Sequence, residues 1–238
     1  NARIIAADRP GMGLSAFKRG RQILDWPEDV TGLADALQID RFAVLGVSGG
    51  GPYAAACALR IPERLTTTGI VCGMGPSDAP GMKDEVSWTI PGQPSLIRRF
   101  VLMLTSMGLR RDPDQFTLRS KETFSEPDRQ LLDQPDLEKV FVDALQEAFR
   151  SGIGGANQDA ALYVHFWGFR LQDITAEVHL WHGGQDENVP VSVGHYVADA
   201  IPNCNARFFR EEGHLTLPHH RMREVLSTLI SRVPGRSL

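Results

Sequence analysis

A glycine-rich turn between a short apolar run and a helical pattern constrains this chain more than any other feature. Residues 41–45 are typical of a buried strand, and residues 53–59 follow a helical pattern. Between them lies the motif G-x-S-x-G, from Gly46 to Gly50, with Ser48 at its centre. A turn this sharp strains its central residue, and the outer glycines allow the backbone to approach itself closely. The motif therefore predicts a raised hydroxyl at a helix N-terminus, where the dipole favours negative charge.

Strand and helix patterns alternate before and after a long middle segment. The predicted strands are residues 3–7, 41–45, 65–72, 178–181 and 206–209. Helical patterns follow most of them, and the last one closes the chain with apolar residues on one face. This alternation predicts an α/β fold with a mostly parallel sheet flanked by helices.

The middle segment shows helical patterns and no strand candidate between about residues 77 and 172. The clearest helical stretches are residues 95–107, 113–124 and 137–149. We therefore expect three parts: residues 1–74 and 173–238 form the α/β core, and residues 75–172 form an inserted helical cap. The aromatic and methionine side chains of this segment either line an apolar pocket or pack the insertion.

Three polar residues follow predicted strands in an order that suggests nucleophilic catalysis. A serine hydroxyl needs a base within hydrogen-bond reach, and that base needs an orienting carboxylate. The chain offers Ser48, Asp186 and His214, each just after a predicted strand. Because loops after parallel strands gather at one sheet edge, we expect these three side chains to lie together.

Four motifs in this order resemble the α/β-hydrolase superfamily, most closely its serine-dependent branch with a helical cap. They are the loop Asp8-Arg9-Pro10-Gly11-Met12-Gly13-Leu14-Ser15, the turn at Ser48, the segment 182–190 and the pair Gly213-His214. The resemblance spans residues 3 to about 233. It implies that Ser48 is the nucleophile, His214 the base and Asp186 the acid, with Asp78 as the alternative acid. It also implies that the N–H of Gly49 donates to the oxyanion.

The sequence departs from the family at its N-terminal end. By resemblance, residues 3–7 and 42–47 are the fourth and fifth strands of a sheet with the spatial order 1-2-4-3-5-6-7-8. Strands 1 to 3 are then absent, together with the loop that supplies the second oxyanion donor. Because unpaired strand edges are unfavourable, we expect one of three explanations: residues 3–7 pair with 42–47, a second copy covers the edge in a homodimer, or the chain is a truncated form.

The composition gives no support for several classes of binding partner. The net charge is −4 and the pI about 6.0, which gives no support for nucleic acid or an anionic membrane. No apolar run approaches the roughly 20 residues of a membrane span. Three cysteines are too few for a disulfide framework and suit the cytoplasm. We expect no cofactor, and no metal, because His214, His219 and His220 lack a matching ligand set.

Two functions follow from these features. The first is a hydrolase that attacks a small-molecule carboxylic ester, or a related acyl substrate, with Ser48. Lactone, amide or carbon–carbon bond hydrolysis and cofactor-free perhydrolysis use the same three residues and remain open. The second is a ligand-binding or signalling protein with little turnover, which the missing oxyanion loop favours.

Overall fold

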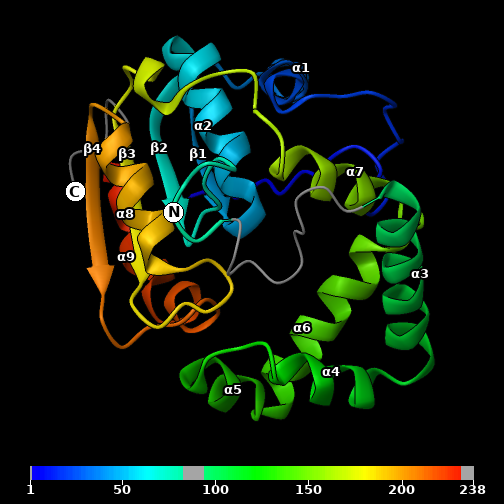
Figure 1. Ribbon diagram of the computed structural model, residues 1–238. Coiled ribbons are helices and arrows are strands. Elements are labelled where there is room, and N and C mark those ends of the chain that lie inside the picture. The colour runs from blue at the N-terminus through cyan, green and yellow to red at the C-terminus, as the bar shows by residue number, and fades with distance from the viewer. Residues whose placement is uncertain (1, 83–93, 232–238) are drawn as a thin grey trace.

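The computed structural model describes residues 2–82 and 94–231. Four strands form one fully parallel sheet in the order β1-β2-β3-β4 (Figure 1). The strands are β1 (Phe42–Val47), β2 (Leu65–Val71), β3 (Val178–Gly183) and β4 (Cys204–Phe209). The predicted α/β class with a parallel sheet flanked by helices is therefore confirmed.

Helices cover both faces of the sheet. Helices α2 (Gly51–Arg60) and α8 (Val191–Ala200) pack on one face, and α9 (Thr216–Ser231) packs on the other. Two neighbouring residues of β2 contribute to opposite faces: Ile70 lies in the apolar cluster with α2 and α8, and Val71 lies in the cluster with α9. Successive strand side chains point to opposite faces, so the burial of every residue of β3 requires helices on both faces.

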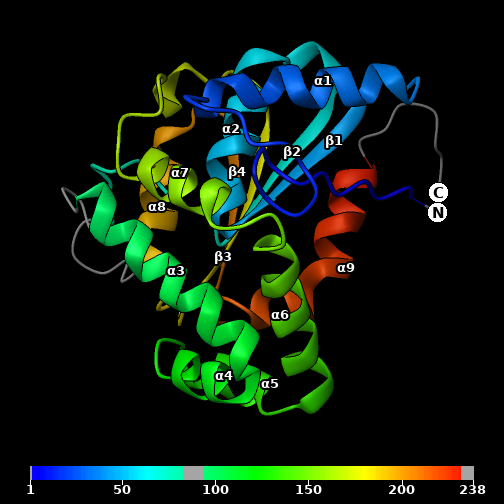
Figure 2. The same ribbon diagram turned by 90° about the vertical axis from the view of Figure 1, so that its right-hand side faces the viewer.

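Of the remaining helices, one precedes the first strand in sequence and the others lie in sequence between two strands of the sheet. Helix α1 (Trp26–Ala36) packs on α2, and Figure 2 shows it crossing above the strands. Five helices, here called the helical insertion, lie in sequence between β2 and β3: α3 (Ser95–Arg111), α4 (Pro113–Lys121), α5 (Glu126–Leu132), α6 (Pro135–Ala148) and α7 (Gly154–Tyr163). Short 3-10 helices are η1 (Ile23–Asp25), η2 (Ser48–Gly50), η3 (Pro62–Arg64) and η4 (Leu171–Asp173). Figure 1 shows α3 to α6 beside and below the sheet.

The predicted strand at residues 3–7 is wrong. These residues form no helix or strand, and the Ile4 side chain is 72% exposed. A groove of 730 Å³, lined mainly by apolar side chains of α1, β1 and α9, lies between this segment and β1. The segment therefore does not pair with β1, because the groove separates their backbones. Among the described residues, β1 has β2 as its sheet partner and is an edge strand.

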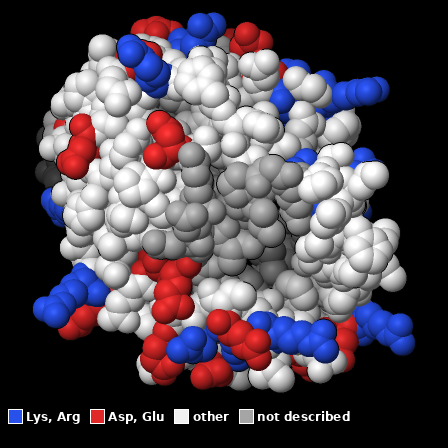
Figure 3. Space-filling view, viewed as in Figure 1, with Lys and Arg blue, Asp and Glu red and all other residues white. Residues whose placement is uncertain are grey.

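The surface carries charges of both signs. Figure 3 shows blue and red side chains mixed along the lower edge, over α4 to α6. Among the described helices, none combines the length and apolar character needed to cross a membrane.

Two isoleucine substitutions test the boundary of the core. We expect Ile70→Ala to lower the free energy of unfolding by about 2–5 kcal/mol, because it opens a cavity beneath α2 and α8. Ile4→Ala should change it by less than about 0.5 kcal/mol, because Ile4 is exposed. Urea titrations of both variants measure the difference. Equal losses would contradict the assignment of residues 3–7 to the surface.

Candidate active site

The turn after β1 has the strained geometry that its motif predicts. Ser48 has a φ of +54°, in the left-handed region that side chains rarely adopt. A Cβ atom at Gly46 would lie 2.3 Å from the carbonyl oxygen of Gly50, so only glycine fits there. The expected steric need for glycine at position 50 itself is not found, because a Cβ at Gly50 would meet open space.

The structure brings together the three residues that the sequence singles out. His214 Nε2 lies 2.9 Å from Ser48 Oγ, and His214 Nδ1 lies 2.8 Å from Asp186 Oδ2. Because a carboxylate only accepts, Nδ1 is the donor to Asp186, and in this tautomer Nε2 can accept from the Ser48 hydroxyl. Ser48 follows β1, Asp186 follows β3 and His214 follows β4, so the parallel sheet delivers all three to one edge.

A network of hydrogen bonds holds Asp186 in the loop after β3. Its Oδ1 accepts from the backbone N–H groups of Asn188 and Val189, which leaves Oδ2 for His214. His182 closes the same loop, since its Nε2–H donates to the Val189 carbonyl at 2.8 Å. Burial lowers the pKa of His182, so its ring is neutral at pH 7. The sequence pattern alone does not identify this hydrogen bond, because the loop that His182 closes is defined only in three dimensions.

The other candidate residues lie in different surroundings. Asp78, the alternative acid, is exposed and accepts a weak hydrogen bond from Tyr196 at 3.4 Å. His220 lies 2.9 Å from Glu212, at the start of α9. Neither residue takes part in the hydrogen bonds that join Ser48, His214 and Asp186.

One group of metal-type ligands exists among the described residues, and it overlaps these three residues. Atoms of Cys72, Asp186 and His214 lie within 4.8 Å of one another. Burial, with the charge of Asp186, raises the pKa of the Cys72 thiol well above its usual value. Metal ions bind thiolates rather than thiols, so this protonated sulfur and an already paired Asp186 and His214 make a poor metal site.

Helix α7 of the helical insertion contacts the turn at Ser48. The Tyr163 hydroxyl donates to the Gly49 carbonyl at 2.8 Å. Burial raises the pKa of Tyr163 well above its usual value, so the hydroxyl stays protonated and remains a donor. A Cβ at Gly49 would lie 2.5 Å from this hydroxyl, which explains the glycine after Ser48.

A buried charge cluster extends this contact. The Asp159 carboxylate accepts from Arg9, Arg21 and Tyr53, while Arg21 also donates to the Tyr53 hydroxyl at 2.6 Å. Arg21 is only 4% exposed, so its guanidinium depends on Asp159 for charge compensation. Sequence patterns did not reveal this cluster, because its members come from the N-terminal loops, α2 and α7.

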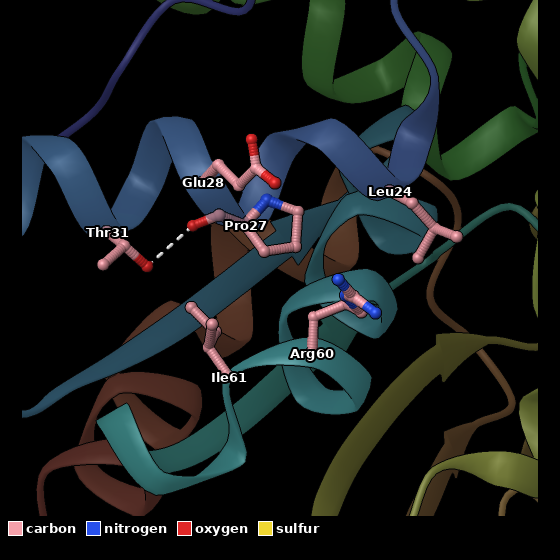
Figure 4. A pocket seen from close by; sticks show the side chains of 6 residues that line it. All are labelled: Leu24, Pro27, Glu28, Thr31, Arg60 and Ile61. Atoms are coloured by element: carbon pink, nitrogen blue, oxygen red, sulfur yellow. Dashed lines mark hydrogen bonds between the residues drawn. The ribbon is translucent and has the colours of Figure 1, made fainter.

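The 730 Å³ groove reaches this cluster, since Arg9, Gly50 and Tyr53 are among its lining residues. A pocket of 320 Å³ lies between α1 and the end of α2 (Figure 4), where Glu28 and Thr31 face Arg60 and Ile61. The dashed line there is the bond from Thr31 Oγ1 to the Pro27 carbonyl, internal to α1. Neither this pocket nor the 730 Å³ groove has Ser48 among its lining residues.

The buried charge cluster predicts that replacing the Asp159 carboxylate strongly lowers the stability of the protein. We expect Asp159→Asn to lower the free energy of unfolding by about 3–5 kcal/mol, because the Arg21 charge loses its buried partner. The matched control is Asp173→Asn, which breaks the exposed pair with Arg170 and should have no measurable effect. Urea denaturation compares the two, and similar losses would contradict the prediction.

His182 predicts a dependence of stability on pH. Its pKa is lowered in the folded protein, so below its unfolded pKa of about 6.5 the unfolded chain binds more protons. The contribution of His182 is therefore complete above about pH 6.5 and is lost as the pH falls, by at most about 1.4 kcal/mol per pH unit. Urea midpoints at about pH 7.5 and about pH 5.5 should differ more for the wild type than for His182→Gln. Equal pH dependence in the two proteins would refute this.

Known proteins resemble this chain over most of its length. The chain is 26% identical over 227 residues to a 2-hydroxymuconate semialdehyde hydrolase of Pseudomonas putida, covering 93% of this chain and 73% of the relative. It is 23% identical over 218 residues to a 2-hydroxy-6-oxo-2,4-heptadienoate hydrolase of Pseudomonas putida (strain ATCC 700007 / DSM 6899 / JCM 31910 / BCRC 17059 / LMG 24140 / F1), covering 89% of this chain and 71% of the relative.

Solved structures and family models agree on the fold. An alpha/beta hydrolase fold protein from Nakamurella multipartita superposes with a TM-score of 0.67 at 20% identity, covering 94% of this chain and 81% of that one. The model of the alpha/beta hydrolase family matches residues 1–228. With this match over nearly the whole sequence, the chain belongs to the alpha/beta hydrolase family.

Proposed function

We propose that this protein is a serine hydrolase of a small-molecule carboxylic ester or related acyl substrate, with Ser48, His214 and Asp186 as its catalytic triad. The observation that carries the proposal is the pair of hydrogen bonds, 2.9 Å and 2.8 Å long, that link Ser48 to His214 and His214 to Asp186. A neutral imidazole between a hydroxyl and a buried carboxylate is the arrangement that activates serine.

The reaction follows from these positions. Ser48 Oγ attacks the acyl carbonyl as its proton passes to His214 Nε2, and Asp186 stabilises the imidazolium. The oxyanion accepts from the N–H of Gly49, at a helix N-terminus whose first N–H groups have no intrahelical acceptor. His214 then protonates the leaving alcohol. A water molecule, activated by the same imidazole, releases the acid and restores Ser48.

We infer the arrangement of cap and core, the substrate class and the location from the rest of the chain. We assign residues 75–172 as a cap over a core made of residues 1–74 and 173–238, because α3 to α7 are inserted between β2 and β3. The relatives are named as hydrolases of a semialdehyde and of an oxo-dienoate, which supports a small-molecule substrate. Free thiols at all three cysteines suit the cytoplasmic location expected from the sequence.

One observation favours the alternative function, a ligand-binding or signalling protein with little turnover. The second oxyanion donor expected from the family follows a strand beyond β1, and the described sheet ends at β1. Loss of one oxyanion donor costs on the order of 10²–10³ in turnover. The two functions therefore differ in the rate of acyl transfer rather than in the triad.

Labelling with a fluorophosphonate tests whether Ser48 is activated. We expect intact-mass analysis to show one adduct on the wild type and none on Ser48→Ala, because the reagent reacts only with an activated serine. His214→Ala should lower the labelling rate by at least on the order of 10²-fold. Ser231→Ala, which removes an exposed serine at the end of α9, is the matched control and should label like the wild type.

The same samples separate the two functions. Labelling together with turnover of a p-nitrophenyl ester panel supports the hydrolase. Labelling without turnover supports the ligand-binding alternative. A folded wild type that takes no adduct would show that the triad geometry does not activate Ser48.

A further inference from the structure

A carboxylate of the helical insertion is buried against the loop that carries His214. Asp128 lies in the first turn of α5 and is 0% exposed. Its Oδ2 accepts from the His214 backbone N–H at 2.8 Å, and its Oδ1 accepts from the N–H groups of Leu215 at 2.8 Å and Thr216 at 2.9 Å. The hydroxyl of Ser125 adds a fourth donor at 2.8 Å. Asp128 therefore binds three consecutive backbone amides.

The local sequence explains why α9 needs an acceptor from elsewhere. The helix begins at Thr216, which makes Leu215 the capping position, and a leucine side chain cannot accept a hydrogen bond. The nearby Thr216 hydroxyl accepts from the Gly213 N–H instead. Without another acceptor, the amide of Thr216 and those of the two residues before the helix would be unpaired. Asp128 supplies the acceptor, and the positive end of the helix dipole favours its negative charge.

The loop is shaped to admit this carboxylate. A Cβ atom at Gly213 would lie 2.4 Å from Asp128 Oδ2, so a side chain there would displace the carboxylate. Because position 213 has no side chain, Asp128 can approach within hydrogen-bond distance of the next residue, His214. The imidazole of His214 is held by Asp186 and Ser48, and its backbone is held by Asp128.

We propose that Asp128 is a positioning residue that places the His214 imidazole through its backbone, so that docking of α5 onto α9 completes the triad. This inference rests on the proposed function, since it assigns Asp128 a role in the geometry of the same base. Asp128 touches neither the reacting serine nor the imidazole. Its effect comes from fixing the loop, where a small displacement of a catalytic group costs about 10²-fold in rate.

Two substitutions at Asp128 test this role. We expect Asp128→Ala to lower the second-order rate of fluorophosphonate labelling by on the order of 10²-fold, because the amides lose their acceptor and the ring moves. Asp128→Asn should lower it by about tenfold, because its amide oxygen still accepts while its NH₂ group faces backbone donors. Asp136→Asn, an exposed aspartate in the first turn of α6, makes the same charge change and should leave the rate unchanged.

A spectroscopic readout separates positioning from general loss of structure. In the wild type, the His214 Nδ1 proton bonded to Asp186 should give a downfield proton resonance that His214→Ala lacks. In Asp128→Asn with an unaltered circular dichroism spectrum, this resonance should shift or broaden. If both Asp128 variants label within twofold of the wild type and keep the resonance, the proposal is wrong while the proposed function stands.

Two further outcomes complete the test. If the wild type is not labelled, the proposed function fails, and the resonance alone decides the role of Asp128. If both variants unfold, amide hydrogen exchange of the wild type decides it, because the amides of residues 214–216 should be as protected as those of α5. Exchange at the rate of unprotected amides would overturn the proposal.

Discussion

The hydrogen-bonded chain from Ser48 through His214 to Asp186 depends on three loops that meet at one edge of a parallel sheet. Each loop is held by its own local constraint. Ser48 sits in a left-handed turn that Gly46 makes possible, Asp186 is bound by two backbone amides, and the His214 backbone is bound by Asp128. The three side chains are therefore already within hydrogen-bond distance of one another, which is the preorganised geometry that the proposed triad needs.

The helical insertion reaches both halves of this site through buried polar groups. Tyr163 of α7 bonds to the Gly49 carbonyl beside Ser48, and Asp128 of α5 bonds to the His214 loop. Asp159 ties α7 further to the N-terminal loops through Arg9 and Arg21. Buried polar groups of this kind are costly unless all partners are present, so they define how the insertion sits on the core.

The edge of the sheet at β1 contrasts with the well-packed site. Residues 3–7 remain outside the sheet, and an apolar groove separates them from β1. An unpaired strand edge beside apolar surface is a place where further strands bind. Both the homodimer and the longer chain that the sequence suggested therefore stay predictions, and each would bring a strand to the same groove.

The sequence by itself determined the parallel α/β sheet, the strained turn at Ser48 and the order of Ser48, Asp186 and His214. These follow from periodicity, glycine spacing and the position of each residue after a strand, all of which are local properties of the chain. Only the tertiary structure decided that residues 3–7 form no strand, because pairing depends on a neighbouring strand. It also decided the hydrogen-bond partners of Asp128, Asp159 and His182, since these partners lie far away in sequence or across a folded loop, where no local pattern identifies them.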